Sequence, residues 1–283
     1  MIAPHRLFLA CALLSTAAYA QWLNFPTPGT PHTPDGKPNL SAPVPRTAEG
    51  KPDLSGVWHV QTLSIAEMRR VFGSGLVDGA LTLSVPGMEI DTISKYALNI
   101  FVDFKPEEAP MRPEAAEIFR RRVTGVEDRE VCLPIGIPLA GLVSEGTKIV
   151  QSPRMTVIMY ESDGTHRQIY TDGRTLPKEN VQPSWLGYSA GKWDRDTLVV
   201  ESAGFNDKTW LDVSGHPHSE ALRIVERYHR RDFGHLDTEV TLDDPKMYTK
   251  PFTIKFTYNL LADSDIFENI CENEKDRVHS GKN

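Results

Sequence analysis

Side chains that can carry out chemistry gather in the stretch 207–220, ahead of a long strand pattern. His216 and His218 are two positions apart, a spacing that occurs in metal sites, and Asp212 or Glu220 can supply a carboxylate. Three interpretations stay open: a metal site, a general base at a cavity mouth, and a rim loop with hydrogen-bonding histidines. Neither glutamate that follows has the offset of a cupin site. No metal is therefore predicted, and the two histidines remain the candidate pair for one.

Glu226 interrupts an apolar strand pattern. Period-two alternation places Glu226 and Tyr228 on one face and Arg227 on the other, so one charge must face the interior of a barrel. The structural interpretation is a buried ion pair, with Arg167 or Glu239 on the next strand as partner. The functional interpretation is an interior acid with a raised pKa that transfers protons.

Two further positions carry possible ligand contacts. Arg174 follows a turn and can present its guanidinium to an anionic ligand at the rim. His166 and Tyr170 share one face of a predicted strand, either inside the barrel or in solvent. The predicted catalytic candidates are His218, His216, Glu226 and Arg174, and the predicted ligand contacts are His166, Tyr170, Trp185, Trp210, Asp212 and Tyr228.

Motifs for nucleophilic catalysis and phosphate binding do not appear. The chain has no Gly-x-Ser-x-Gly elbow, and Ser219 adjoins His218 in sequence instead of facing it. The glycines around Gly191 do not form a phosphate-cradling loop. No cofactor is therefore predicted.

Residues 1–20 have the pattern of a secretory signal. A weakly basic start precedes the apolar run 7–14, and Ala18-Tyr19-Ala20 is a small-x-small cleavage site. We therefore expect a periplasmic or secreted protein. No later apolar run approaches the length of a transmembrane helix, so no transmembrane segment is predicted.

The charge pattern argues against nucleic acid as a partner. The whole chain has a net charge of −7, and loss of the signal removes one arginine and no acid, which gives −8. No basic stripe with interleaved aromatic residues is present. The sequence does not indicate an oligomeric state.

Two cysteines remain after removal of the signal, Cys132 and Cys271. In an oxidising compartment two cysteines most simply form one disulfide, which here would tie the middle of the chain to its C-terminal end. The alternative is two separate buried thiols.

Residues 21–46 form a Pro-rich, extended leader without periodicity, and 47–283 is predicted to be a single barrel domain. The segment Gly-Lys-Pro-(Asn/Asp)-Leu-Ser occurs twice, at 36–41 and 50–55. Two copies are too few for a solenoid, so we expect a duplicated turn that docks twice on one rim.

The remaining pattern is mainly β. A helical insertion is expected at about 64–122, with capping-box spacing at Ser64 and Pro113 at the start of a second helix. From Lys148 onward, consecutive hairpins with short turns predict an antiparallel up-and-down barrel of about eight or nine strands.

Two resemblances support this architecture. The segment 54–58, Leu-Ser-Gly-Val-Trp, is similar to the Gly-x-Trp opening of lipocalin-like barrels, which implies that Trp58 is a structural plug at the closed end. The second lipocalin signature, Thr-Asp-Tyr, is not matched, because Gly173 follows Thr171-Asp172.

The closer resemblance is to a group of exported proteins of environmental bacteria. It implies no activity, and it rests on segments spread over nearly the whole mature chain. These are 50–58, Cys132-Leu133-Pro134-x-Gly136-x-Pro138, 172–174, Gly191-Lys192-Trp193-x-x-Asp196-Thr197-Leu198-Val199-Val200, 215–219, Glu226-Arg227 and 243–245.

Two main functions follow from the sequence. The first is binding of a small hydrophobic or aromatic molecule in an interior cavity. The second is a cofactor-independent lyase, isomerase or hydrolase that uses His and Glu acid–base chemistry in the same cavity. A third possibility, an envelope interaction module, predicts a large exposed apolar patch instead of a cavity.

Overall fold

The computed structural model describes residues 25–75, 77–78, 94–125, 132–143, 145–178 and 181–269. The expected signal peptide and Cys271 lie outside these residues, so export and the Cys132–Cys271 bridge stay predictions. In the part of the chain that is described, no helix has the length and apolar character needed to cross a membrane.

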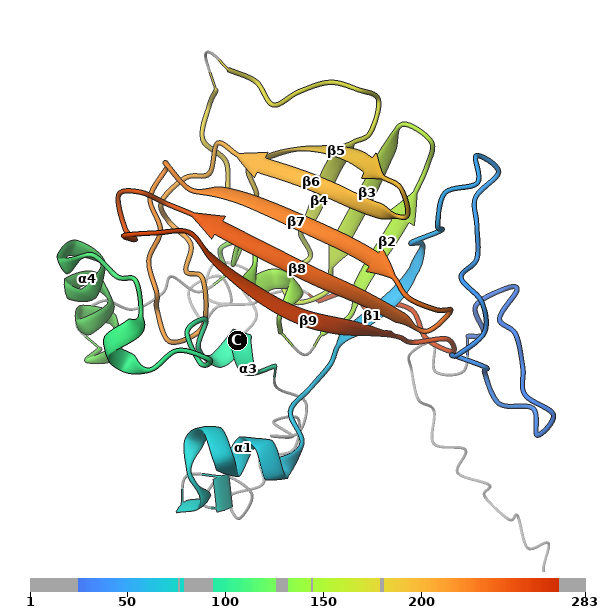
Figure 1. Cartoon of the computed structure of the whole chain (residues 1–283), viewed down its shortest axis with the longest axis horizontal. Helices are drawn as coiled ribbons and strands as arrows, with labels where there is room; N and C mark the ends of the chain where they lie inside the picture. Colours follow the sequence, from blue (N-terminus) through green and yellow to red (C-terminus); the bar gives the residue numbers. More distant parts are fainter. Residues whose placement is uncertain are drawn as a thin grey trace, which may run out of the picture.

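The described chain forms a closed barrel of nine strands, which confirms the mainly β fold with eight or nine strands (Figure 1). Each strand pairs with its successor, and β1 pairs with β9 to close the ring. The strands are β1 (Gly56–Val60), β2 (Thr147–Gln151), β3 (Met155–Tyr160), β4 (His166–Tyr170), β5 (Tyr188–Asp194), β6 (Thr197–Ala203), β7 (Arg223–Arg230), β8 (His235–Asp243) and β9 (Phe252–Leu260).

One pair of neighbouring strands is parallel, so the prediction of an entirely antiparallel, up-and-down barrel was wrong. Ile169 pairs with Ser189 and Tyr170 with Ala190, with β4 and β5 running in the same direction. A ring of strands in alternating directions needs an even number of strands, so a ring of nine contains at least one parallel pair. Residues 171–187 connect β4 to β5 and exceed the roughly one dozen residues that a parallel connection requires.

The interior of the barrel is lined mainly by apolar side chains that alternate along each strand. On β7, Ile224, Glu226 and Tyr228 are buried whereas Arg223 and Val225 are exposed, which confirms the predicted alternation. Burial of each large aliphatic side chain contributes about 1.5–3 kcal/mol. Other buried residues of the wall are Trp58, Ile149, Ile158, Ile169, Leu198, Val200, Leu236, Val240 and Ile254.

Trp58 on β1 is buried in the core beside Arg230 of β7. Its side chain is fully buried, and its indole Nε1–H donates to the carbonyl of Leu54 at 3.0 Å. The guanidinium carbon of Arg230 lies 4.9 Å from the Trp58 ring centroid, and Arg230 also donates to the carbonyls of Asp53 and Phe233. Burial lowers the pKa of Arg230 to about 10. Trp58 and Arg230 therefore tie β1, β7 and the incoming chain together.

The repeated sequence forms the same turn twice, as predicted. The N–H of Thr33 donates to Lys37 O at 2.8 Å, and the N–H of Thr47 donates to Lys51 O at the same distance. In each turn the N–H of the glycine, Gly36 in the first, donates to the threonine carbonyl at 2.9 Å. We call residues 33–37 and 47–51 the N-terminal turns.

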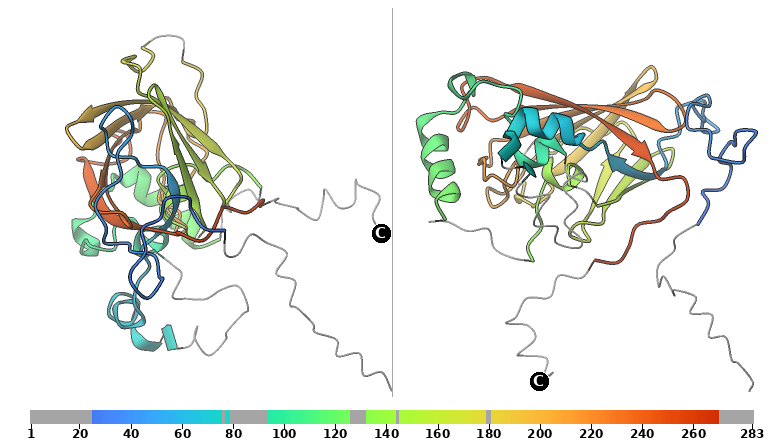
Figure 2. Two further views of the ribbon diagram at one scale, coloured as in Figure 1. Left: turned by 90° about the vertical axis from the view of Figure 1, so that its right-hand side faces the viewer. Right: turned by 90° about the horizontal axis from the view of Figure 1, so that it is seen from below.

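Chain segments beside both N-terminal turns dock at one end of the barrel (Figure 2, left). Next to the first turn, Leu40 O accepts a hydrogen bond from Gly234 N at 2.7 Å, on the connection between β7 and β8. Next to the second, Arg46 forms an ion pair of 2.7 Å with Asp196, on the connection between β5 and β6. Much of the Pro-rich leader is therefore attached to the folded barrel through the predicted turns.

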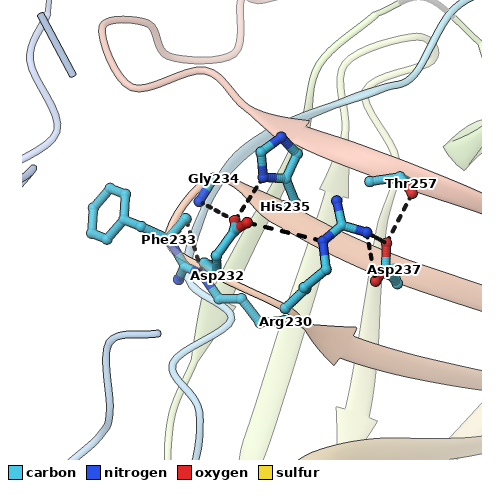
Figure 3. A network of polar contacts seen from close by, with 8 residues as sticks. Arg230, Asp232, Phe233, Gly234, His235, Asp237 and Thr257 are labelled. Carbon is cyan, nitrogen blue, oxygen red and sulfur yellow. Dashed lines mark hydrogen bonds and ion pairs between the residues drawn. The ribbon is translucent and has the colours of Figure 1, made fainter. Parts of the chain in front are cut away.

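The connection between β7 and β8 is shaped by Asp232 (Figure 3). Its carboxylate accepts hydrogen bonds from the N–H of Gly234 at 3.1 Å and from the Nδ1 of His235 at 2.6 Å. Two residues after His235 on β8, the carboxylate of Asp237 accepts a hydrogen bond of 2.9 Å from the Thr257 hydroxyl. These contacts fix the connection that receives Leu40.

The helical insertion lies between β1 and β2, as predicted. The helices are α1 (Ile65–Phe72), α3 (Lys95–Leu98) and α4 (Pro113–Val123), with 3₁₀ turns at Pro106–Glu108 and Leu139–Gly141. Ser64 caps α1 by accepting from Glu67 N at 3.2 Å, and Pro113 occupies the first turn of α4. In Figure 1, α4 lies at the end of the barrel opposite the N-terminal turns.

Gly234→Ala tests whether the leader is part of the folded barrel. A Cβ at this position would collide with the Cβ of Leu40 and lie 2.9 Å from its carbonyl oxygen. We expect the free energy of unfolding, measured in urea, to fall by about 1–3 kcal/mol. Gly75→Ala, where nothing lies within 4 Å of the added Cβ, is the control. Equal stability of the two variants would contradict the docked leader.

Candidate functional site

The parallel seam between β4 and β5 opens into a pocket. The two strands pair at only two positions, Ile169–Ser189 and Tyr170–Ala190, so the wall is not continuous beside the first residues of β4. An open pocket of about 570 Å³ lies there, which we call the seam pocket. Its lining consists of Pro134, Gly164, Thr165, His166, Arg167, Gln168, Tyr170, Ser184, Trp185, Leu186, Gly187, Tyr188 and Ser189.

Three of the sequence-predicted ligand contacts meet in the seam pocket: His166, Tyr170 and Trp185. His166 is exposed and Tyr170 is partly exposed, because Arg167 and Ile169 take the two interior positions of β4. The sequence left open whether His166 and Tyr170 face the barrel interior or solvent, and in the structure they face outward.

Sequence reasoning missed several residues of the same lining. Tyr188 and Leu186 add apolar surface from the start of β5, and Gln168 accepts a hydrogen bond of 2.7 Å from the Tyr170 hydroxyl. The alternation pattern places Gln168 on the same strand face as His166 and Tyr170, but Gln168 was not among the predicted ligand contacts. Leu186 and Tyr188 carried no such signal, because they reach the pocket only through the parallel pairing.

Behind the seam, Arg167 and Glu226 form an ion pair across the interior of the barrel. Arg167 Nη1 lies 2.8 Å from Glu226 Oε2, and Nη2 donates to Oε1 at 3.1 Å. The Tyr228 hydroxyl donates to the same Oε1 at 2.7 Å. The predicted ion pair with Arg167 is confirmed, but the partners come from β4 and β7, which are not neighbours. The bond therefore spans the lumen instead of adjacent strands.

Burial dominates the electrostatics of this pair and its surroundings. It raises the pKa of Tyr160 to about 12 and holds the pKa of Tyr228 and Tyr258 well above the usual range, with Glu226 adding to each effect. Burial works against the charged form of Arg167, but attraction from Glu226, Tyr160 and Tyr228 together outweighs it and raises the guanidinium pKa. The cluster thus consists of one ion pair among neutral phenols.

The ion pair does not use all of its hydrogen-bonding capacity. Within the described residues, Arg167 Nε and Nη1, Glu226 Oε2 and Thr238 Oγ1 are buried without a hydrogen-bond partner. The 2.8 Å contact of Nη1 with Oε2 is close enough for charge attraction but lacks hydrogen-bond alignment. Buried polar atoms without hydrogen-bond partners lower the free energy of unfolding. Removal of either charge leaves the other unpaired in the interior and should lower the free energy of unfolding further.

His216 and Asp212 form a second buried pair, at 2.5 Å between Nδ1 and Oδ2. Asp212 also accepts from the backbone N–H of Ile100 at 2.6 Å and of Gly215 at 2.9 Å. The imidazole of His216 stacks on Phe119 of α4, with ring centroids 4.1 Å apart. This pair therefore fastens the helical insertion to the loop before β7.

His218 is engaged at both ring nitrogens. Nδ1 lies 3.2 Å from the carbonyl of Ser219, which can only accept, and Nε2 lies 2.6 Å from the Thr209 hydroxyl. We assign the proton to Nδ1, so that Nε2 accepts from Thr209. Burial lowers the pKa of His218, which keeps the imidazole neutral.

The remaining predicted site residues lie apart from these pairs. The guanidinium carbon of Arg174 lies 3.8 Å from the ring centroid of Tyr170. Arg174 Nη2 also forms an ion pair of 2.6 Å with Asp172 Oδ2. Trp210 lies beneath Arg122, 4.9 Å from the ring centroid to the guanidinium carbon. Arg174 thus borders the seam pocket, whereas Trp210, Asp212, His216 and His218 do not line it.

The structure does not gather a metal site or an acid–base constellation from the predicted residues. Among the described residues, no group of three or more His, Cys, Asp and Glu side chains is placed to hold a metal ion. His216, His218, Glu226 and Arg174 each contact different partners. Cys132 is described, but its predicted partner Cys271 is not.

A second open pocket, of about 460 Å³, lies on the outer wall at β6–β9. Its charged side chains are partly paired with each other or with neighbours, as in the ion pair of Lys255 with Glu239 at 2.7 Å and that of Arg227 with Asp194 at 3.2 Å. Phe256 is its single aromatic residue. The seam pocket, with its several aromatic side chains, is the better candidate for a ligand site.

A double-mutant cycle on Arg167→Met and Glu226→Met tests the buried ion pair. Each single change leaves an unpaired charge in the interior and should lower the free energy of unfolding in urea by about 3–5 kcal/mol. The double variant should lose much less than the sum of the two. The exposed pair Lys255–Glu239, treated in the same way, should show a coupling below about 1 kcal/mol. Equally small coupling at both pairs would rule out the interior ion pair.

The lowered pKa of His218 predicts that the free energy of unfolding falls in acid. The unfolded chain binds a proton at His218 below about pH 6.5, whereas the folded protein resists it because the pKa is lowered. The stability from neutral His218 is therefore present above about pH 6.5 and is lost as the pH falls towards the folded value. His218→Gln should flatten the dependence of the unfolding free energy on pH, with His166→Gln as the control for loss of a histidine. An unchanged slope would contradict the buried neutral imidazole.

No protein-family model, no curated protein and no solved structure matches this chain. The function of the chain is therefore inferred from the geometry of its site.

Proposed function

We propose that this protein is an exported binding protein that takes up a small, mainly apolar molecule in the seam pocket. The observation that carries the proposal is the lining itself. Trp185, Tyr170, Tyr188 and Leu186 surround an open space of about 570 Å³, within the range of about 300–1,000 Å³ typical of ligand sites.

The polar groups of the pocket suit orientation of a ligand more than chemical conversion. His166, Gln168 and Ser184 provide a few hydrogen-bonding groups beside the aromatic surface. The aromatic rings of Tyr170 and Tyr188 are held in place by hydrogen bonds of their hydroxyls, at 2.7 Å to Gln168 and at 3.0 Å to Gln182. A lining fixed in this way reduces the ordering cost of binding.

The enzyme alternative has less support from the geometry. It needs His and Glu side chains that converge on one substrate, and the described chain instead has His216 beneath α4, His218 on Thr209 and Glu226 across the lumen. The proposed binding site also differs from the interior cavity that the sequence predicted. The interior holds the ion pair and apolar side chains, so we assign the ligand to the opening in the wall.

Titration with N-phenyl-1-naphthylamine, a neutral apolar fluorophore, tests the proposed function. We expect saturable binding with one site, and Trp185→Ala should weaken it about tenfold because the aromatic contact is lost. Phe256→Ala, in the pocket on the outer wall, is the matched control and should leave the affinity unchanged. Loss of binding in Phe256→Ala but not in Trp185→Ala would place the site on the other pocket and contradict the proposal.

A further inference from the structure

The charges around the seam pocket are unusual for this chain. The protein as a whole has 38 acidic and 31 basic residues, yet no Asp or Glu of the described chain lines the pocket. Its lining does include the guanidinium of Arg167, and two more cations, Arg174 and Lys208, lie against its aromatic rings. The described lining of the pocket therefore lacks acidic side chains, although the protein as a whole is acidic.

Most of this positive charge is already balanced. Arg167 is paired with Glu226 at 2.8 Å, and Arg174 is paired with Asp172 at 2.6 Å. Neither guanidinium offers a full charge to a ligand, because a second anion would compete with a carboxylate in contact.

Lys208 is the exception among these cations. Its ammonium lies 5.9 Å from the ring centroid of Trp185, and no carboxylate of the described residues is within ion-pair distance of it. The backbone N–H of Lys208 donates to the side-chain oxygen of Asn206 at 3.1 Å, which fixes the base of the side chain. The ammonium of this exposed lysine thus lies beside the aromatic wall, and none of the described carboxylates forms an ion pair with it.

We infer that the ligand of the seam pocket is an anion, an apolar and preferably aromatic skeleton with one acidic group that faces Lys208. The inference rests on the proposed function and names its ligand class. The flat part of the molecule packs against Trp185 and Tyr188, and its carboxylate or sulfonate approaches the ammonium of Lys208 from the same side. The absence of acids from the lining removes the repulsion that an anion would meet elsewhere on this chain.

A matched pair of fluorophores tests the inference. 8-Anilino-1-naphthalenesulfonate has the skeleton of N-phenyl-1-naphthylamine with one added sulfonate, so the ratio of their dissociation constants isolates the charge. We expect the sulfonate to bind about fivefold more tightly at low salt, and this advantage to disappear at about 1 M salt, where charges are screened within about 3 Å. The two probes should displace each other.

Lys208→Gln should abolish the preference for the sulfonate and leave the affinity for the neutral probe unchanged. Lys192→Gln removes the same charge from β5 outside the pocket and should preserve the preference. Suppose that binding of the neutral probe depends on Trp185. If the protein then shows no preference for the sulfonate, or loses this preference equally in both lysine variants, the ligand is not an anion, but the pocket stands. If neither probe responds to Trp185→Ala, the proposed function and the inference fail together.

Discussion

A ring of nine strands cannot close with every neighbour antiparallel, and this constraint shapes the molecule. One parallel contact is required, and it lies between β4 and β5, where two residues on each strand pair. The long connection 171–187 is needed to reverse the direction of the chain. Where the two strands separate, the wall opens and the aromatic residues of the start of β5 meet the outward face of β4. The candidate site is thus a direct consequence of an odd strand number.

The interior of the barrel supports the same arrangement from behind. Arg167 on β4 reaches across the lumen to Glu226 on β7, and the Tyr228 hydroxyl completes the contact. β4 pairs with β5 at only two positions, and the ion pair adds a long-range contact between β4 and β7. A buried pair of this kind adds little net stability over apolar side chains of the same volume, but loss of one partner is costly.

The two ends of the barrel are secured by parts of the chain that are not strands. At one end, Arg230 contacts Trp58, and chain beside the N-terminal turns docks on the strand connections through Leu40 and Arg46. At the other, Asp212 and His216 fasten α4 and the segment around Ile100 to the loop before β7. The side chains of Trp58, Arg230, Asp212 and His216 do not line the seam pocket.

Local patterns in the sequence predicted local structure well. Alternation on β7, the capping box at Ser64 and the repeated turn all depend on residues close in sequence. The Glu226 ion pair was predicted with the right partner, although not across the lumen. The roles of His216 and His218 were not accessible, because their burial depends on contacts with Phe119 and Thr209 that form only in the folded chain.

The parallel seam itself also had no local signal. Its residues are typical strand and loop types, and only the total number of strands and the closure of β1 on β9 impose it. The same global closure decides that His166 and Tyr170 face outward, and so decides where a ligand can bind. Counting strands before assigning directions would have indicated that one parallel pair was needed, but not its place.

The central claim, that the opening at β4–β5 is the ligand site, is tested most directly by hydrogen exchange with and without bound N-phenyl-1-naphthylamine. Protection should appear in peptides that cover 164–170 and 184–189, and peptides of β8 and β9 should exchange at unchanged rates. Protection centred on β8 and β9, or on the loop 209–219, would contradict the account.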